Sequence, residues 1–127
     1  GDPVESVLEM TLGGVDHALD AIGKPPTPSQ AFAMLRPGGT ATIIGMIPLG
    51  ATVELPGVDF LAEKRIQGSC MGSNQFRTDA SRFVDFYFDG RLDLDSLITD
   101  RLQLDQIDEG MDAFETGEVA RNIIVFD

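Results

Sequence analysis

Hydrophobic residues follow two different patterns along the first 72 residues of the chain, namely helical spacing and continuous runs. Spacings of three and four predict two helices, over residues 2–12 with Asp2 as the cap and over residues 27–36 with Thr27 as the cap. Apolar or β-branched runs that end at small residues or glycine predict three strands, at residues 15–22, 40–47 and 66–72. Helices that alternate with strands in this way predict an α/β fold with a parallel sheet.

The strand expected at 40–47 is the most apolar of the three. It offers no polar face, so we expect it to be central and covered on both sides, and the residues after Gly23 suffice for a crossover that makes it the parallel neighbour of 15–22. Gly45 lies at its exit and has no Cβ, which would let a flat ligand approach the backbone at the carboxyl edge of the sheet. A buried strand with a tight exit turn remains the alternative.

The remaining segments predict further elements and a change of pattern. We expect a short edge strand at 50–56, a helical turn at 60–64, a helix from Thr78 or Asp79 to Gly90, a helix from an Asp105 cap to about Gly117, and a closing strand at 122–126. Two helices and one strand replace the earlier alternation. This change predicts two domains, at 1–72 and 73–127.

Composition and charge exclude several classes of partner. The formal net charge is -12, with 9 basic and 21 acidic residues, which argues against a nucleic-acid surface and against an anionic membrane partner. No apolar run approaches the roughly 18 residues of a membrane span, and no leader begins the chain. A single cysteine excludes an internal disulfide and favours a cytoplasmic location.

The side chains that could carry chemistry are few. The sequence has no G-x-G-x-x-G, no phosphate loop and no nucleophile elbow. One histidine, His17, and one cysteine, Cys70, cannot form a zinc site, and we expect a structural or surface histidine and a buried, inert thiol. Acidic pairs such as Asp93 with Asp95 are expected on solvated faces. We therefore assign neither a catalytic residue nor a metal ligand in this chain.

Arg121 is the only basic residue among the last 26. It precedes the closing strand, where its guanidinium could bind a phosphate through two parallel hydrogen bonds. On the residues alone, pairing with one of the many surface acids is the preferred interpretation.

Several segments, in their order and spacing, resemble one known family. They are GVDHALDAIG at 14–23, LRPGGT at 35–40, IGM at 44–46, LDQIDEGM at 104–111 and GEVAR at 117–121. Together they resemble the C-terminal part of the zinc-dependent, medium-chain alcohol dehydrogenases, over essentially the whole chain. The branches that handle formaldehyde adducts or simple alcohols are the most similar.

The resemblance implies a fold and an activity. The fold would be the second half of a Rossmann-type parallel sheet, its fourth to sixth strands, followed by the C-terminal returning segment of the catalytic domain. The parent enzyme would transfer hydride between an alcohol, or a hydroxymethyl-thiol adduct, and NAD, with NADP not excluded. The zinc ligands, the glycine-rich loop and the acidic ribose ligand would lie outside this chain, so the chain alone is expected to be inactive.

The resemblance also implies cofactor-binding residues. Ile22 and Gly23 would lie beside the adenosine half of the cofactor. The nicotinamide half would contact residues that follow the next two strands, namely Ile44, Gly45, Met46, Ser69 and Met71. Arg121 would reach the pyrophosphate, which reverses the interpretation given above.

Subunits of the family pair through the extended stretch after the fifth strand and the helix that follows. We therefore expect a homo-oligomer that uses residues 51–64, and a small alcohol or aldehyde as the substrate of the parent. The alternative is a non-catalytic α/β ligand-binding or interaction module that shares only the fold.

Overall fold

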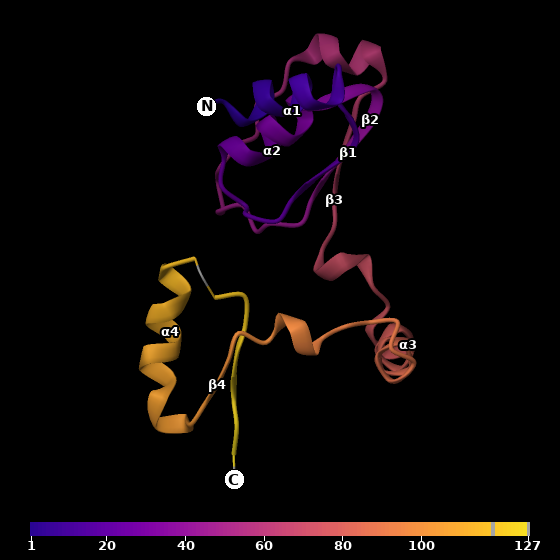
Figure 1. The fold of residues 1–127 in the computed structure, drawn as a ribbon. Coiled ribbons are helices and arrows are strands. Elements are labelled where there is room, and N and C mark those ends of the chain that lie inside the picture. Colours follow the sequence, from indigo (N-terminus) through magenta and orange to yellow (C-terminus); the bar gives the residue numbers. More distant parts are fainter. Residues whose placement is uncertain (118, 127) are drawn as a thin grey trace. The chain divides into compact units, whose positions relative to one another are not determined.

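The computed structural model describes residues 1–117 and 119–126. The chain forms two compact units, residues 1–74 and residues 75–127, which are described separately. Figure 1 shows the elements of each unit. The described part of the chain contains no helix with the length and hydrophobicity that a membrane-spanning helix needs.

A three-stranded parallel sheet forms the centre of the first unit. Its order is β1 (Val15–Asp20), β2 (Leu35–Ile43) and β3 (Arg65–Gly68). Ala41 of β2 lies opposite Ala18 on one side and Ile66 on the other. The predicted α/β fold and the central, parallel position of the second strand are therefore confirmed, and β1 is an edge strand in this chain.

Helix α1 (Pro3–Thr11) precedes β1 in the chain, and helix α2 (Pro26–Ala33) precedes β2. The Asp2 carboxylate accepts the amide of Val4 at 2.8 Å, so the predicted cap of α1 is confirmed. The predicted cap of α2 is wrong. Its helix begins one residue before Thr27, and the Thr27 hydroxyl donates to Asp20 Oδ1 at 2.8 Å instead of capping the helix.

The C-terminal end of α2 also differs from the prediction, because β2 begins at Leu35 and not after the two glycines. Val15 pairs with Leu35, and His17 pairs with Thr40, so residues 36–39 form an irregularity opposite a single residue of β1. Gly38 has a φ of +79°, which this bulge requires.

The core of the first unit surrounds Phe32 of α2, which is fully buried. Leu35 and three alanines, Ala18, Ala31 and Ala41, are buried with it. The Phe60 ring, from the 3-10 helix η1 (Gly57–Ala62), lies 5.3 Å from the Phe32 ring between centroids.

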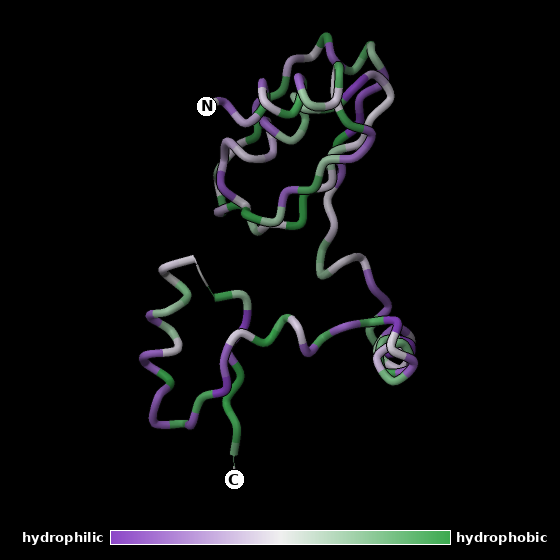
Figure 2. Tube along the Cα trace, viewed as in Figure 1, coloured by the Kyte–Doolittle hydropathy of each residue, from purple (hydrophilic) through white to green (hydrophobic). Residues whose placement is uncertain are grey.

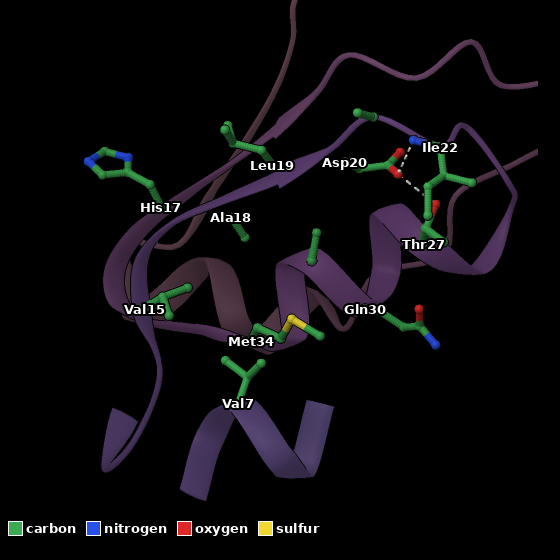
Figure 3. A pocket seen from close by; sticks show the side chains of 12 residues that line it. Val7, Val15, His17, Ala18, Leu19, Asp20, Ile22, Thr27, Gln30 and Met34 are labelled. Atoms are coloured by element: carbon green, nitrogen blue, oxygen red, sulfur yellow. Dashed lines mark hydrogen bonds between the residues drawn. The ribbon is translucent and has the colours of Figure 1, made fainter. Parts of the chain in front are cut away.

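This core covers only one face of the sheet. Leu19 of β1 is 69% exposed, and Figure 3 shows Leu19 and His17 pointing away from α2. Thr40 and Thr42 of β2 are half-buried. The expectation that the central strand is covered on both faces is therefore wrong for the described chain, because α2 and the segment that carries Phe60 pack on the same side.

Residues 50–56 form no strand, so the predicted edge strand is also wrong. The segment belongs to no sheet, and the Glu54 carbonyl instead accepts the hydroxyl of Ser29 on α2 at 2.9 Å. Leu55 packs against the core beside this bond. The segment therefore follows the helix layer and not the sheet.

The second unit contains α3 (Phe76–Phe88), β4 (Asp100–Leu102), α4 (Ile107–Glu115) and β5 (Asn122–Ile124). The strands β4 and β5 are parallel, and Asp100 lies opposite Asn122. No pattern of residues predicted β4, which has only three residues. The closing strand is confirmed, and β4 is its partner in the described structure.

Both helices of the second unit begin differently from the prediction. α3 begins before Thr78, and the Asp79 carboxylate accepts the amide of Gln75 at 2.7 Å. The turn η4 (Leu104–Gln106) precedes α4, and Gln103 and Gln106 form a reciprocal capping box there. Asp105 is therefore not the cap. The glycines predicted to end the two helices, Gly90 and Gly117, have positive φ angles of 68° and 75°.

The burial of Phe32 yields a stability prediction. Phe32→Ala removes a fully buried ring and should lower the free energy of unfolding by about 3 kcal/mol or more. Phe88 is 80% exposed, so Phe88→Ala should change it by less than about 0.5 kcal/mol. Urea denaturation followed by far-ultraviolet circular dichroism measures both. Equal effects of the two variants would contradict the assigned core.

Candidate functional site

The carboxyl ends of the three strands of the first unit are joined by backbone hydrogen bonds. The Asp20 carbonyl, at the end of β1, accepts the amides of Ile44 and Gly45 at 2.7 and 2.9 Å. The Ile43 carbonyl, at the end of β2, accepts the amide of Ser69 at 2.8 Å. The segments that follow the strands are therefore held beside one another at one edge of the sheet. Figure 2 shows hydrophobic stretches where β1 and β2 leave the sheet.

Two glycines allow the exits of β1 and β2 to approach closely. A Cβ on Gly45 would lie 2.6 Å from Gly23 Cα and 2.7 Å from the carbonyl carbon of Ile22. A Cβ on Gly23 would lie 2.6 Å from the backbone nitrogen of Met46, and Gly23 has a φ of +74°. The space beside Gly45 is thus filled by backbone. The expectation that this space admits a flat ligand is corrected, because it serves the contact between the two exits.

Asp20 is the only buried charged residue of the described chain, with 4% of its surface exposed. Its Oδ1 accepts the amides of Ile22 at 3.1 Å and Gly23 at 3.4 Å, and also the Thr27 hydroxyl. Figure 3 shows this carboxylate between the turn after β1 and the start of α2. Its Oδ2 is buried and has no partner in the described structure. Asp20 was not among the candidate residues, although an acid at the end of a strand, three residues before a glycine, is a usable signal of such a turn.

An open groove of about 590 Å³ lies at the exits of β2 and β3. Its lining is mainly apolar and consists of Ile43, Ile44, Gly45, Met46, Gly68, Ser69, Cys70 and Met71. Met46 and Met71 are 91% and 84% exposed. Cys70 is also exposed, so the expectation of a buried thiol is wrong. The physical reason is that β3 ends at Gly68, which leaves Cys70 in the loop beyond the sheet.

The structure brings together seven of the eight predicted cofactor residues. Ile22 and Gly23 follow β1, and the others of this set follow β2 or β3, namely Ile44, Gly45, Met46, Ser69 and Met71. The exposed apolar side chains could cover the face of a flat ring, and backbone groups beside them could bind its polar edge. The assignment of these residues to a cofactor stays a prediction.

Arg121, the eighth residue, belongs to the second unit. Its carbonyl accepts the Thr99 amide at 2.7 Å, and its amide donates to the Thr99 hydroxyl at 3.3 Å, which fixes the backbone at the entry to β5. Its side chain is exposed and forms no ion pair or hydrogen bond with a described residue. The surface pairing that the residues alone favoured is therefore not observed within 1–117 and 119–126.

The acidic pair Asp93 and Asp95 has structural partners in the second unit. The Ser96 amide donates to Asp93 at 3.1 Å, and this hydrogen bond lowers the pKa of the Asp93 carboxyl. The Tyr87 hydroxyl donates to Asp95 at 2.8 Å, and this bond, together with the charge of Asp95, raises the pKa of Tyr87. Both shifts have local causes and indicate no acid-base catalyst.

The described residues do not fit a metal site. They contain no cluster of three or more His, Cys, Asp or Glu side chains that could hold an ion. His17 is exposed on β1, and Cys70 lies in the loop after β3. No chemistry of a bound metal can be derived from these side chains.

The chain is similar in sequence to a known family of dehydrogenases and to individual members of it. The family described as "Zinc-binding dehydrogenase" matches residues 1–86. The geraniol dehydrogenase of Carpoglyphus lactis is 36% identical over 126 residues, which are 99% of this chain and 33% of that protein. The class-3 alcohol dehydrogenase of Cereibacter sphaeroides is 32% identical, over 99% of this chain and 35% of that protein.

A solved structure shares the fold as well. The crystal structure of benzyl alcohol dehydrogenase from Acinetobacter calcoaceticus matches with a TM-score of 0.90 and 28% identity, and the match covers 100% of this chain and 35% of the other. The chain thus spans about one third of the relatives it matches. The resemblance to zinc-dependent medium-chain alcohol dehydrogenases is confirmed, and because the family match covers more than half of the residues, the chain belongs to the zinc-binding dehydrogenase family.

Proposed function

We propose that this chain is part of a zinc-containing, NAD(P)-dependent alcohol dehydrogenase and supplies one side of its dinucleotide site. The observation that carries the proposal is the convergence of the three strand exits. The amides of Ile44 and Gly45 donate to the Asp20 carbonyl, and the amide of Ser69 donates to the Ile43 carbonyl. The carboxyl edge of a parallel sheet is where open α/β folds bind nucleotides. Membership of the zinc-binding dehydrogenase family supports the same site. A small alcohol or aldehyde, or a hydroxymethyl-thiol adduct, would be the substrate.

The groove at the exits of β2 and β3 has a suitable chemistry for the nicotinamide half. Ile44 is 44% exposed and Met46 and Met71 are more exposed, so a flat ring could bury these apolar surfaces. The bound cofactor would exchange a hydride with the substrate at the nicotinamide ring. The residues of this chain would pack against that ring and exclude water from one face of it. Ile22, which is 66% exposed after β1, would cover the adenosine half.

The two parts of the chain would have different roles in that enzyme. We assign residues 1–72 to the second half of the dinucleotide-binding domain and residues 73–127 to the returning segment of the catalytic domain. The observed division into units after Asn74 supports a change of role near this point. The zinc ligands would lie outside the chain, since the described side chains do not form a metal site.

Arg121 provides the test of this function. In the full-length enzyme, Arg121→Ala should weaken NAD binding by about 1.5–3 kcal/mol, because a charge-assisted hydrogen bond to the pyrophosphate is lost. Arg121→Lys should recover only part of the affinity, because lysine lacks the planar fork. Arg101→Ala is the matched control on the neighbouring strand β4 and should leave the affinity unchanged.

Fluorescence titration with NAD measures the dissociation constant of each variant. If Arg121→Ala binds NAD as the wild type does, Arg121 has no role at the pyrophosphate. If the wild type binds neither NAD nor NADP, the dehydrogenase proposal is wrong and the non-catalytic α/β module becomes the better interpretation.

We further propose that the protein is a homo-oligomer whose contact includes residues 51–64. The exposed apolar side chains Val58 and Leu61, 70% and 86% exposed, support this location. Leu61→Asp should shift the protein to a smaller species in light scattering, because a charge would be buried in the contact. Leu12→Asp, at a residue 96% exposed outside the segment, should not. A monomeric wild type, or an unchanged oligomer in Leu61→Asp, would contradict the proposed contact.

A further inference from the structure

We propose that Asp20 is a positioning residue of the dinucleotide site, which holds the turn at Ile22 and Gly23 in the shape that receives the adenosine half of the cofactor. The inference rests on the proposed function and assigns a role to a side chain that does not itself contact the cofactor. Three observations carry it: the convergence of donors on one carboxylate oxygen, the burial of that carboxylate, and the restricted geometry of the turn.

Asp20 connects the two strand exits through two different groups. Its carbonyl accepts the amides of Ile44 and Gly45 after β2, while its Oδ1 accepts the amides of Ile22 and Gly23 after β1. The Thr27 hydroxyl donates to the same Oδ1 at 2.8 Å. One residue therefore fixes the turn after its own strand to both the neighbouring exit and the start of α2.

The burial of this carboxylate indicates a specific role. Asp20 is 4% exposed, and burying a carboxylate costs free energy unless donors compensate for the lost water. The start of α2 offers few backbone donors, because Pro25, Pro26 and Pro28 have no N–H. The carboxylate is therefore bonded mainly to the turn, and the positive end of the α2 dipole adds a favourable field.

The turn itself needs this support. Gly23 has a φ of +74°, and glycine has more conformational freedom to lose than any other residue. The adjacent Ile22 side chain is 66% exposed and so is available to a ligand. If Oδ1 were removed, two amides would lose their acceptor, and cofactor binding would have to order the turn.

The unequal use of the two oxygens makes the inference testable. All three donors bind Oδ1, whereas Oδ2 has no partner in the described structure. Asp20→Asn can place its carbonyl oxygen at the position of Oδ1 and keep all three bonds. Asp20→Ala removes them. Asp16→Ala is the matched control, since Asp16 lies on the same strand and forms an exposed ion pair with Arg36.

The experiment uses the full-length enzyme and compares dissociation constants for NAD and for ADP-ribose, which retains the adenosine half but lacks nicotinamide. Asp20→Ala should raise both constants about tenfold, with kcat at saturating NAD and the KM for the alcohol unchanged. Asp20→Asn should stay within about twofold of the wild type, and Asp16→Ala should match it. A purely structural loss would lower kcat or the folded fraction and would not raise both constants in parallel.

Each contrary result has a defined meaning. Unchanged constants in Asp20→Ala, with a wild type that binds NAD, would overturn the role of Asp20 and leave the proposed function intact. Equal damage by Asn and Ala would overturn the role of Oδ1 as an acceptor. A wild type that binds no dinucleotide would remove the proposed function and this inference with it.

If Asp20→Ala does not fold, Thr27→Val gives a second test, because it removes one donor to Oδ1 and leaves the carboxylate in place. We expect the constant for ADP-ribose to rise about threefold in Thr27→Val and to return to the wild-type value in Thr27→Ser. No change in Thr27→Val would overturn the inference.

Discussion

The close contact between the exits of β1 and β2 is the constraint on which the candidate site depends. The Asp20 carbonyl accepts two successive amides, those of Ile44 and Gly45, so the segment after β2 is bonded to the end of β1. Neither Gly23 nor Gly45 could carry a Cβ without meeting backbone atoms at less than 3 Å. Sheet pairing, turn geometry and the surface offered to a ligand are consequently set by the same few atoms.

This contact explains why exposed and buried groups lie side by side at the edge of the sheet. The backbone is occupied internally, while Ile22, Met46 and Met71 are largely exposed. A hydrogen-bonded backbone beside exposed apolar side chains suits a ligand that is flat and partly polar. If the dinucleotide binds here as proposed, the strand exits would offer it an open apolar surface and not a glycine-rich phosphate loop.

The sequence predicted the elements whose pattern is local and repeated. The apolar run around Ile43 identified the central strand, and Asp2 identified a helix cap, because both signals are contained in a few adjacent residues. Thr27 and Cys70 were misinterpreted because the hydroxyl of Thr27 bonds to the carboxylate of Asp20 across the turn, and because β3 ends two residues before Cys70. The pattern at Asp20, an acid three residues before a glycine, could have indicated the local bonds to Ile22 and Gly23, but not the burial of the carboxylate, which depends on α2 lying on the sheet.

Native-state hydrogen exchange tests the central claim most directly. If the exits are held together as described, the amides of Ile44 and Gly45 should exchange as slowly as that of Ala41 inside β2, because both donate to the Asp20 carbonyl. The amide of Leu49, in the exposed loop beyond, should exchange rapidly. Exchange at Ile44 and Gly45 as fast as at Leu49 would contradict the account, since it would mean that the exit of β2 is free of β1.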